Sequence, residues 1–183
     1  MSLNGPSLTG LRRVLAEDRN YARVRAEAAR GFAARSEDYQ ISAPAGLRSA
    51  LLAEMADGLG NTATAEGSSL VPVVLAITAT GREAEDLTEA LRAFLPADAV
   101  AEFPSWETLP HERLSPRSDT VGRRLSVLRR LAHPENTASG ALRVVVAPVR
   151  AVVQPIVAGL GELVPVTLKV GQEVPFSNVF RSL

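Results

Sequence analysis

Two nearly uninterrupted apolar runs constrain the fold of this chain more than any other feature. They cover residues 70–77 and 142–147 and are rich in valine, leucine and isoleucine. Short runs of this kind are typical of strands buried on both faces of a parallel sheet. Parallel strands need long crossover connections, and the sequence between the runs carries helical patterns. The chain is therefore predicted to be an α/β protein, with a mostly parallel sheet flanked by helices.

Helical patterns surround both runs. Apolar spacing and composition predict helices over residues 8–16, 21–32, 44–59, 82–94 and 119–132. Thr80, with Glu83 three residues later, matches a capping box at the start of one of them. In the last helix, Ser118 or Asp119 is expected to be the cap. Its buried stripe is expected to be Val121, Leu125, Leu128 and Leu131.

The remaining segments give weaker signals. A short strand is predicted over residues 99–103 and a marginal one over residues 39–41. Over residues 164–170, apolar and polar residues alternate, which is typical of a half-buried strand. Small polar residues over 60–69 indicate a mobile loop, and residues 148–160 a short helix or turn. No internal repeat is present. We expect one domain over residues 1–163 and the start of a second over residues 164–183.

Composition excludes several classes of function. Twenty basic and twenty acidic residues give a net charge of zero, which disfavours an autonomous nucleic-acid binder. The chain has no cysteine and two histidines, so neither a disulfide framework nor a zinc site is expected, and we predict no cofactor. No apolar run approaches the ~20 residues of a membrane span, and no secretory signal is present, so we expect a soluble, cytoplasmic protein.

Residues 103–121, here called the tryptophan segment, contain the single tryptophan, Trp106. Loops of this length are usually functional or disordered. Apolar anchors along the segment favour a loop packed onto the domain, with Trp106 as a buried plug. The alternative is an exposed Trp106 that stacks on bases or anchors an interface.

Four motifs occur in a fixed order. They are Thr-Ala-Thr-Gly-Arg-Glu-Ala-Glu-Asp over 78–86, Phe-Pro-Ser-Trp-Glu-Thr-Leu-Pro over 103–110, Ser-Pro-Arg-Ser-Asp over 115–119, and Val-Val-Ala-Pro-Val over 145–149. This series, followed by Gln154 and Pro155, resembles the bacterial transcription-repair coupling factor family (Mfd). More distantly it is similar to the excision-repair protein UvrB. The resemblance spans about residues 42–171 and corresponds to the N-terminal UvrB-homology module.

The resemblance implies a degenerate P-loop NTPase-like fold, like domain 1a of UvrB. Members of the family displace stalled RNA polymerase at DNA lesions and recruit excision repair through UvrA. Their ATP-dependent translocase motor lies in other domains, so this fragment is expected to be a non-catalytic interaction and regulatory module. Its partners would be UvrA, bound by the second domain, the rest of its own chain, and RNA polymerase through the whole factor.

The residues that would hold a nucleotide support this interpretation. In a P-loop, glycine amides and a lysine hold phosphates, and a Ser or Thr holds magnesium. In the matching stretch, residues 42–49, Gly46 is the one glycine, Leu47 replaces the lysine and Arg48 replaces the Ser or Thr. Pro44 removes a backbone donor. We therefore expect no working ATP site.

Other candidate sites carry less information. His111 and Glu112 near Asp119 have no metal spacing or nucleophile with them, so they are interpreted as loop-surface residues. Arginines cluster in the last predicted helix, and they could touch DNA phosphates or form a solvated face or interface rim. The candidate partner-binding residues are Arg123, Arg124, Arg130, Lys169, Phe180 and Arg181.

Two hypotheses from different classes follow. The first is the interaction module described above, with weak DNA binding or none. The second is a stand-alone nucleotide- or DNA-binding repair enzyme domain, as UvrB is. Leu47, Arg48 and the balanced charge favour the first.

Overall fold

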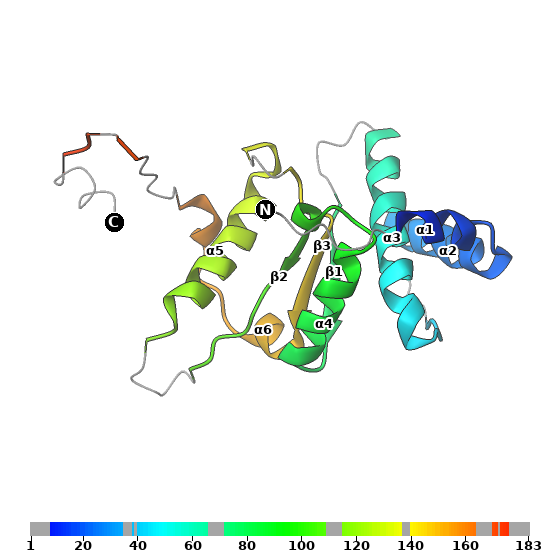
Figure 1. Cartoon of the computed structure of the whole chain (residues 1–183), viewed down its shortest axis with the longest axis horizontal. Helices are drawn as coiled ribbons and strands as arrows, with labels where there is room; N and C mark the ends of the chain where they lie inside the picture. The colour runs from blue at the N-terminus through cyan, green and yellow to red at the C-terminus, as the bar shows by residue number, and fades with distance from the viewer. Residues whose placement is uncertain are drawn as a thin grey trace.

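The computed structural model describes residues 8–34, 38, 40–65, 72–108, 115–136, 140–163, 170–171 and 173–175. Three helices come first: α1 (Thr9–Ala16), α2 (Arg19–Ala34) and α3 (Ala45–Ala65). Strands and helices then alternate: β1 (Val74–Thr78), α4 (Gly81–Arg92), β2 (Val100–Glu102), α5 (Ser118–Ala132), β3 (Val144–Pro148) and α6 (Val149–Val153). Short 3-10 turns are η1 (Ala97–Ala99), η2 (Pro134–Asn136) and η3 (Leu160–Glu162). Figure 1 shows α1, α2 and α3 on one side of the sheet and α5 on the other.

The described strands form one parallel sheet with the order β1-β3-β2. The central strand β3 is buried along its whole length. The prediction of an α/β fold with a parallel sheet is confirmed, and so is the prediction that residues 142–147 contain a strand buried on both faces.

Strand β1 departs from its prediction. The apolar run predicted burial on both faces, but the side chains of Leu75 and Ile77 are 53% and 54% exposed. The reason is sheet order, because β1 lies at an edge among the described strands. Its other face is covered, and Ala76 is 7% exposed.

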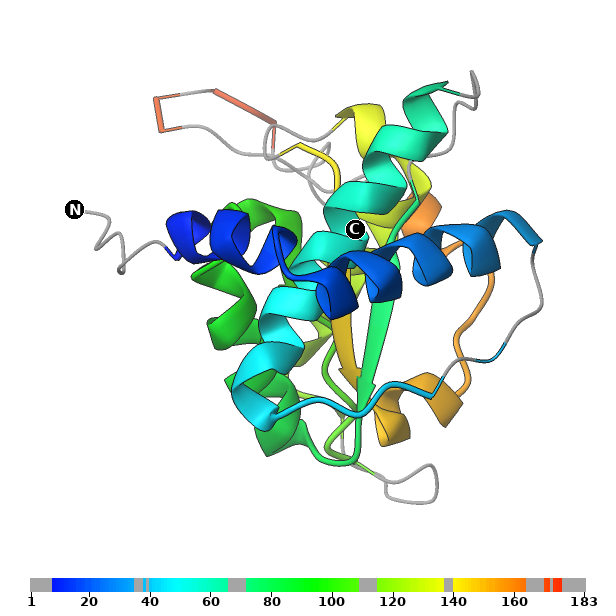
Figure 2. The ribbon, with the colours of Figure 1, turned by 90° about the vertical axis from the view of Figure 1, so that its right-hand side faces the viewer.

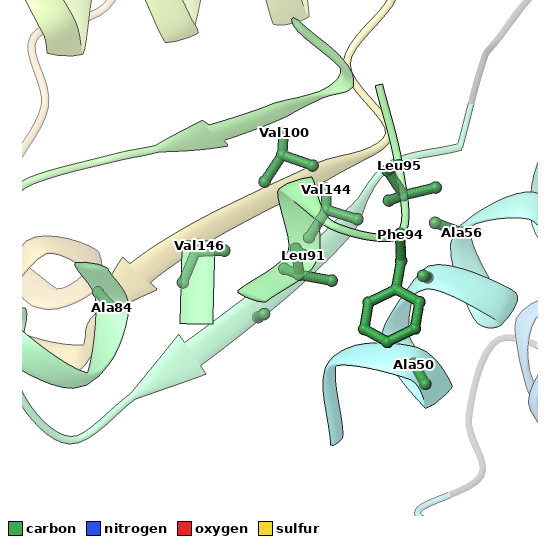
Figure 3. Packing of buried hydrophobic residues seen from close by; sticks show 11 residues of the cluster. Ala50, Ala56, Ala84, Leu91, Phe94, Leu95, Val100, Val144 and Val146 are labelled. Carbon is green, nitrogen blue, oxygen red and sulfur yellow. The ribbon is translucent and has the colours of Figure 1, made fainter. Parts of the chain in front are cut away.

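Helices cover both faces of the sheet. On one face, side chains of α3 and α4 pack against β1 and β3, and the residues after α4 close the end of this core (Figure 3). The labelled members are Ala50, Ala56, Ala84, Leu91, Phe94, Leu95, Val100, Val144 and Val146. On the other face, Val127 of α5 and Ala151 of α6 pack with Phe103 and with Val145 and Ala147 of β3. The buried residues that α3 contributes to this core are the alanines Ala50, Ala53 and Ala56.

The start of α4 confirms the predicted capping box. The side chain of Thr80 accepts a hydrogen bond from the Glu83 amide at 3.2 Å. The Glu83 carboxylate in turn accepts one from the Ala79 amide at 3.1 Å. The Glu83 amide, which the first helical turn leaves without a main-chain partner, is thereby satisfied, and so is the amide of Ala79, the residue before the cap.

Helix α5 is rotated relative to its predicted orientation. Its buried residues are Thr120, Arg124 and Val127. Of the predicted stripe, Val121, Leu125 and Leu128 are half-buried and Leu131 is 42% exposed. The predicted cap is also wrong, because the helix begins at Ser118 and Arg117 precedes it without a side-chain cap bond. Arg124 can be buried here because its guanidinium packs against two aromatic rings and donates a hydrogen bond to a carbonyl.

The two N-terminal helices are tied to α3 by polar contacts. Arg12 of α1 donates to Glu54 at 2.7 Å, to Asp57, and to the carbonyl of Phe94 at 3.2 Å. The hydroxyl of Tyr21 in α2 donates to the carbonyl of Ala50 at 2.8 Å. Burial raises the pKa of Tyr21 to about 12. These bonds anchor the helices predicted over residues 8–16 and 21–32.

Helix α3 is longer than predicted. It continues to Ala65, so the predicted loop over residues 60–69 is wrong for its first six residues. Extending an existing helix adds one hydrogen bond per residue fixed, and residues of modest propensity can therefore continue it. The marginal strand over 39–41 is not found at residues 40 and 41, and Tyr39 lies outside the described residues.

Three other predictions match their elements. β2 lies within residues 99–103, α6 within 148–160, and α4 within 82–94 apart from its first residue. The strand predicted over 164–170 falls almost wholly outside the described residues, and the boundary after residue 163 stays a prediction. Among the described helices, none combines the length and apolar character that crossing a membrane requires.

Candidate functional site

The start of α3 is where a phosphate-binding loop would lie. Pro44 directly precedes the helix, and its carbonyl accepts the amide of Leu47 at 3.0 Å. Gly46 is already inside the helix, and a Cβ added to it would meet no atom within 4 Å. Neither a glycine-dependent turn nor a close backbone approach is present here. The first turn therefore lacks the loop of amides that surrounds a phosphate in a P-loop.

A groove of about 850 Å³ opens beside this helix start. Its walls come from α3, from β1 and the residues after it, from α4, and from the segment that precedes α3. Most of its lining side chains are apolar. Its charged lining residues are Arg48, Glu83 and Asp86. Since the acidic residues outnumber the cation, the groove does not favour a polyphosphate.

Metal-assisted chemistry finds no support in the described part of the chain. No group of three or more His, Asp or Glu side chains there could hold a metal ion. Glu83 is engaged by the capping box, and Asp86 pairs with the exposed Arg82 at 3.6 Å. The groove is therefore mostly apolar, with three charged residues in its lining.

The second candidate is the tryptophan segment, whose first half is attached to α5 through Arg124. The guanidinium carbon of Arg124 lies 4.1 Å from the ring centroid of Phe103 and 4.3 Å from that of Trp106. One of its nitrogens donates to the carbonyl of Pro104 at 2.7 Å. Arg124 is 2% exposed, and desolvation by burial lowers its pKa. Two aromatic faces and a carbonyl thus replace the water around this charge.

Further bonds hold the same loop in place. The side-chain oxygen of Gln154 accepts the amide of Trp106 at 2.8 Å. The buried hydroxyl of Thr120 donates to the carboxylate of Glu107, and this bond lowers the pKa of Glu107. Trp106 is half-buried, so the predicted plug packs on an arginine rather than inside the apolar core.

The predicted arginine cluster separates into different environments. Arg123 pairs with Glu102, and Arg130 donates to the carbonyls of Asp98 and Gly140. Arg129 donates to the carbonyl of Leu163 at 2.9 Å. Arg124 is removed from the predicted partner surface by its burial, which corrects that part of the prediction.

Several predicted residues fall elsewhere. His111, Glu112, Lys169, Phe180 and Arg181 lie outside the described residues. Asp119 is exposed, and its carboxylate accepts from Arg117 at 3.2 Å. No acid–base pair with Asp119 can therefore be assigned.

Sequence reasoning missed the contacts between Arg124 and the two rings. Thr120, Arg124 and Val127 follow helical spacing, and they lie one residue out of register with the apolar stripe. Two aromatic residues three apart, Phe103 and Trp106, were the available signal. The local pattern does not indicate which arginine of α5 packs against these two rings. The candidates are Arg123, Arg124, Arg129 and Arg130.

Comparison with known proteins supplies the family relationship. No protein-family model matches this chain. It is 57% identical over 111 residues to the transcription-repair-coupling factor of Mycobacterium bovis (strain ATCC BAA-935 / AF2122/97). It matches the factor of Mycobacterium tuberculosis (strain CDC 1551 / Oshkosh) to the same extent.

The match covers 60% of this chain and 9% of the length of each of these relatives. The relatives therefore carry most of their sequence outside the matched part. Identity this high over more than a hundred residues shows that the matched part of this chain is similar to the transcription-repair-coupling factors.

Proposed function

We propose that this chain is a non-catalytic interaction and regulatory module of a transcription-repair coupling factor. The observation that carries the proposal is the 57% identity to two such factors over 111 residues. The relatives are named for coupling transcription to repair, and the module would serve that process through protein contacts.

The start of α3 supports the non-catalytic part of the proposal. Leu47 and Arg48 stand where a nucleotide site needs a lysine and a hydroxyl, and Gly46 lies in regular helix. The neighbouring groove is apolar with an acidic majority among its charges. A nucleotide polyphosphate would find neither the donors nor the positive field that hold it elsewhere.

Proteins are the partners that we propose. UvrA would dock on the domain that begins after residue 163, with Lys169, Phe180 and Arg181 as candidate contacts. RNA polymerase would be engaged by the whole factor, and the module would pack against the rest of its own polypeptide. Arg123 and Arg130 are engaged by Glu102 and by main-chain carbonyls, which leaves little free charge for DNA.

The alternative is a stand-alone nucleotide- or DNA-binding repair enzyme domain like UvrB. It requires phosphate contacts from the chain itself, and the groove beside α3 offers only Arg48 as a cation. No described feature favours it over the first proposal.

Titration of the 183-residue chain with purified UvrA, followed by calorimetry, tests the proposal. We expect saturable binding that Lys169→Glu combined with Arg181→Glu weakens. The double variant Arg82→Glu with Arg92→Glu makes the same charge change on exposed parts of α4, so it is the matched control and should leave binding unchanged. Absence of UvrA binding together with ATP hydrolysis above background would instead favour the enzyme alternative.

A further inference from the structure

The two N-terminal helices carry an excess of basic residues. Residues 8–34, which contain α1 and α2, include six arginines and no lysine. The acidic residues of the same segment are Glu17, Asp18 and Glu27. The whole chain has a net charge of zero, so the rest of it carries an acidic excess of the same size. Positive charge is therefore concentrated at this end of the molecule, although the total charge conceals it.

Some of these charges hold the helices in place. Arg12 donates to the carboxylate of Glu54 at 2.7 Å, and a nitrogen of Arg25 lies 3.5 Å from the same carboxylate. Asp18 is the cap of α2, because its carboxylate accepts the amides of Asn20 and Tyr21, both at 2.9 Å. Arg12, Arg25 and Asp18 therefore have structural roles, and they attach or begin the two helices.

Other arginines of the same helices face solvent. Arg13, Arg19 and Arg23 are exposed, and within the described part of the chain their side chains have no hydrogen bond or ion pair. Arg19 and Arg23 lie one turn apart on α2, so they project from the same side of that helix. We call these three residues the basic face. Arg48 of α3 and Arg150 of α6 also have no partner among the described residues, but each stands alone on its helix. The arginines of α4 and α5 are engaged within the fold.

The surface around the arginines of α2 is polar. Helices α1 and α2 lie on the side of α3 that is away from the sheet, and Figure 2 shows them following one another across α3. None of the large apolar residues that are exposed in the described chain lies on α2, whose exposed residues include Asn20 and Ala26. Protein interfaces are centred on aromatic and apolar anchors, whereas arginine and polar side chains suffice to hold a phosphate backbone. The surface of α2 therefore favours a nucleic acid over a protein.

We propose that the basic face binds the phosphate backbone of double-stranded DNA without sequence preference. The guanidinium groups of Arg13, Arg19 and Arg23 each donate to a phosphate, a geometry for which arginine is well suited. Contacts to phosphates carry no sequence information. Three such contacts give an affinity at the weak end of non-specific binding, with a dissociation constant of about 10⁻⁴ M. A contact of this strength becomes effective when the module is tethered to a polypeptide that holds DNA elsewhere. The inference goes beyond the proposed function, which concerns protein partners.

The salt dependence of DNA binding by the 183-residue chain tests the inference. The probe is a fluorescently labelled duplex of about 20 base pairs, or two helical turns. Its anisotropy is titrated with the protein at salt concentrations between about 50 and 200 mM. Neutralising three phosphates should give a slope of about −2.7 in a plot of log affinity against log salt. The affinity should therefore fall about 40-fold across this fourfold range of salt.

Matched variants locate the site. Arg19→Gln combined with Arg23→Gln should weaken binding at the lowest salt about tenfold or more and reduce the salt slope by about two, one unit for each lost phosphate contact. Both side chains lack partners within the described fold, so the melting temperature should be unchanged. Arg82→Gln combined with Arg92→Gln removes the same charge from exposed parts of α4, and DNA binding should be unchanged.

Three results would overturn the proposal. An unchanged salt slope in the Arg19 and Arg23 double variant would mean that DNA is bound elsewhere or not at all. Equal losses in this variant and in the α4 control would mean that net charge, and not the basic face, determines binding. The third result is that a polyglutamate peptide binds as tightly as the duplex, which would make the basic face a site for acidic proteins. These measurements do not involve UvrA, so failure here and failure of the proposed function are separate results.

Discussion

The guanidinium carbon of Arg124 lies 4.3 Å from the ring centroid of Trp106, and this contact joins α5 to the tryptophan segment. The same guanidinium rests on Phe103 and donates to the carbonyl of Pro104. A single buried cation therefore organises three residues of the loop, and the single tryptophan reports on it directly.

Replacing Arg124 with alanine should destabilise the domain by about 2–4 kcal/mol, because a charge-assisted hydrogen bond and two cation–π contacts are lost. Trp106 fluorescence should shift to the red as its covered face meets water. Urea unfolding followed at the Trp106 emission measures both effects. Arg123→Ala, which removes an exposed ion pair, is the control and should cost about 0–1 kcal/mol. Equal losses for the two variants would contradict a central role for Arg124.

The bond between Thr120 and Glu107 should make stability depend on pH. The Thr120 hydroxyl lowers the pKa of Glu107 below its ordinary value of 4.5, so the ionised form is favoured in the folded state. The stabilisation of the folded state by this bond is fully present at pH values above 4.5. It is lost as the pH falls through the folded-state pKa of Glu107. Thr120→Val should therefore lower the melting temperature at pH 7, and the difference from the native chain should shrink in acid.

Thr88→Val is the matched control for this experiment. The hydroxyl of Thr88 is also buried, but it donates to the carbonyl of Ala84 at 2.7 Å, which does not titrate. Its effect on melting temperature should be the same in acid and at neutral pH. A pH-independent effect of Thr120→Val would rule out the proposed linkage.

Gly161 sets the distance between η3 and α5. A Cβ on Gly161 would lie 3.0 Å from the carbonyl oxygen of Leu128 and 3.1 Å from the Cβ of Ala132. Gly161→Ala should therefore cost about 1–3 kcal/mol, as overpacking does. It should also loosen the contacts that His133 and Arg129 make with Glu162 and Leu163.

Gly122 of α5 is a position where the same substitution, glycine to alanine, should have the opposite effect on stability. A Cβ there meets no atom within 4 Å, and Gly122 lies in the interior of α5. Gly122→Ala should stabilise the domain by up to about 1 kcal/mol through helix propensity. Thermal unfolding of both variants checks the pair, and a neutral Gly161→Ala would show that η3 is not closely packed on α5.

Nucleotide should not stabilise this chain. A ligand present at 100 times its dissociation constant raises stability by about 2.7 kcal/mol, which a thermal shift detects easily. We expect no shift with Mg-ATP, and none after Leu47→Lys and Arg48→Thr are combined, because Pro44 and the regular helix at Gly46 remain. A clear shift in the native chain would reopen the enzyme alternative.

DNA binding should be weak and without sequence preference, with a dissociation constant of about 10⁻⁴ M or weaker at physiological salt. Arg123 and Arg130 already have partners within the fold, so contact with phosphates requires those bonds to be exchanged. Fluorescence anisotropy with duplex DNA measures this. Submicromolar binding that Arg123→Glu abolishes would place a DNA interface on α5.

Local patterns in the sequence determined much of this protein. Hydrophobic periodicity located α4, α5 and β3, and the Thr80–Glu83 spacing specified a capping box that forms. Positions 47 and 48, where the resemblance would place a lysine and a Ser or Thr, hold Leu47 and Arg48, and this is visible without any structure. These features depend on neighbours within a few residues, so consecutive sequence encodes them directly.

Sheet order and the packing of α5 were decided only by the tertiary structure. The run that became β1 has the composition of a fully buried strand, yet its position at an edge leaves Leu75 and Ile77 exposed. Arg124 has the sequence context of a surface arginine, yet Phe103 and Trp106, some 20 residues away, receive it in the interior. Strand pairing and side-chain burial depend on residues that are distant in the chain. The stability of a strand or of a buried charge therefore depends on which distant residues the fold places beside it.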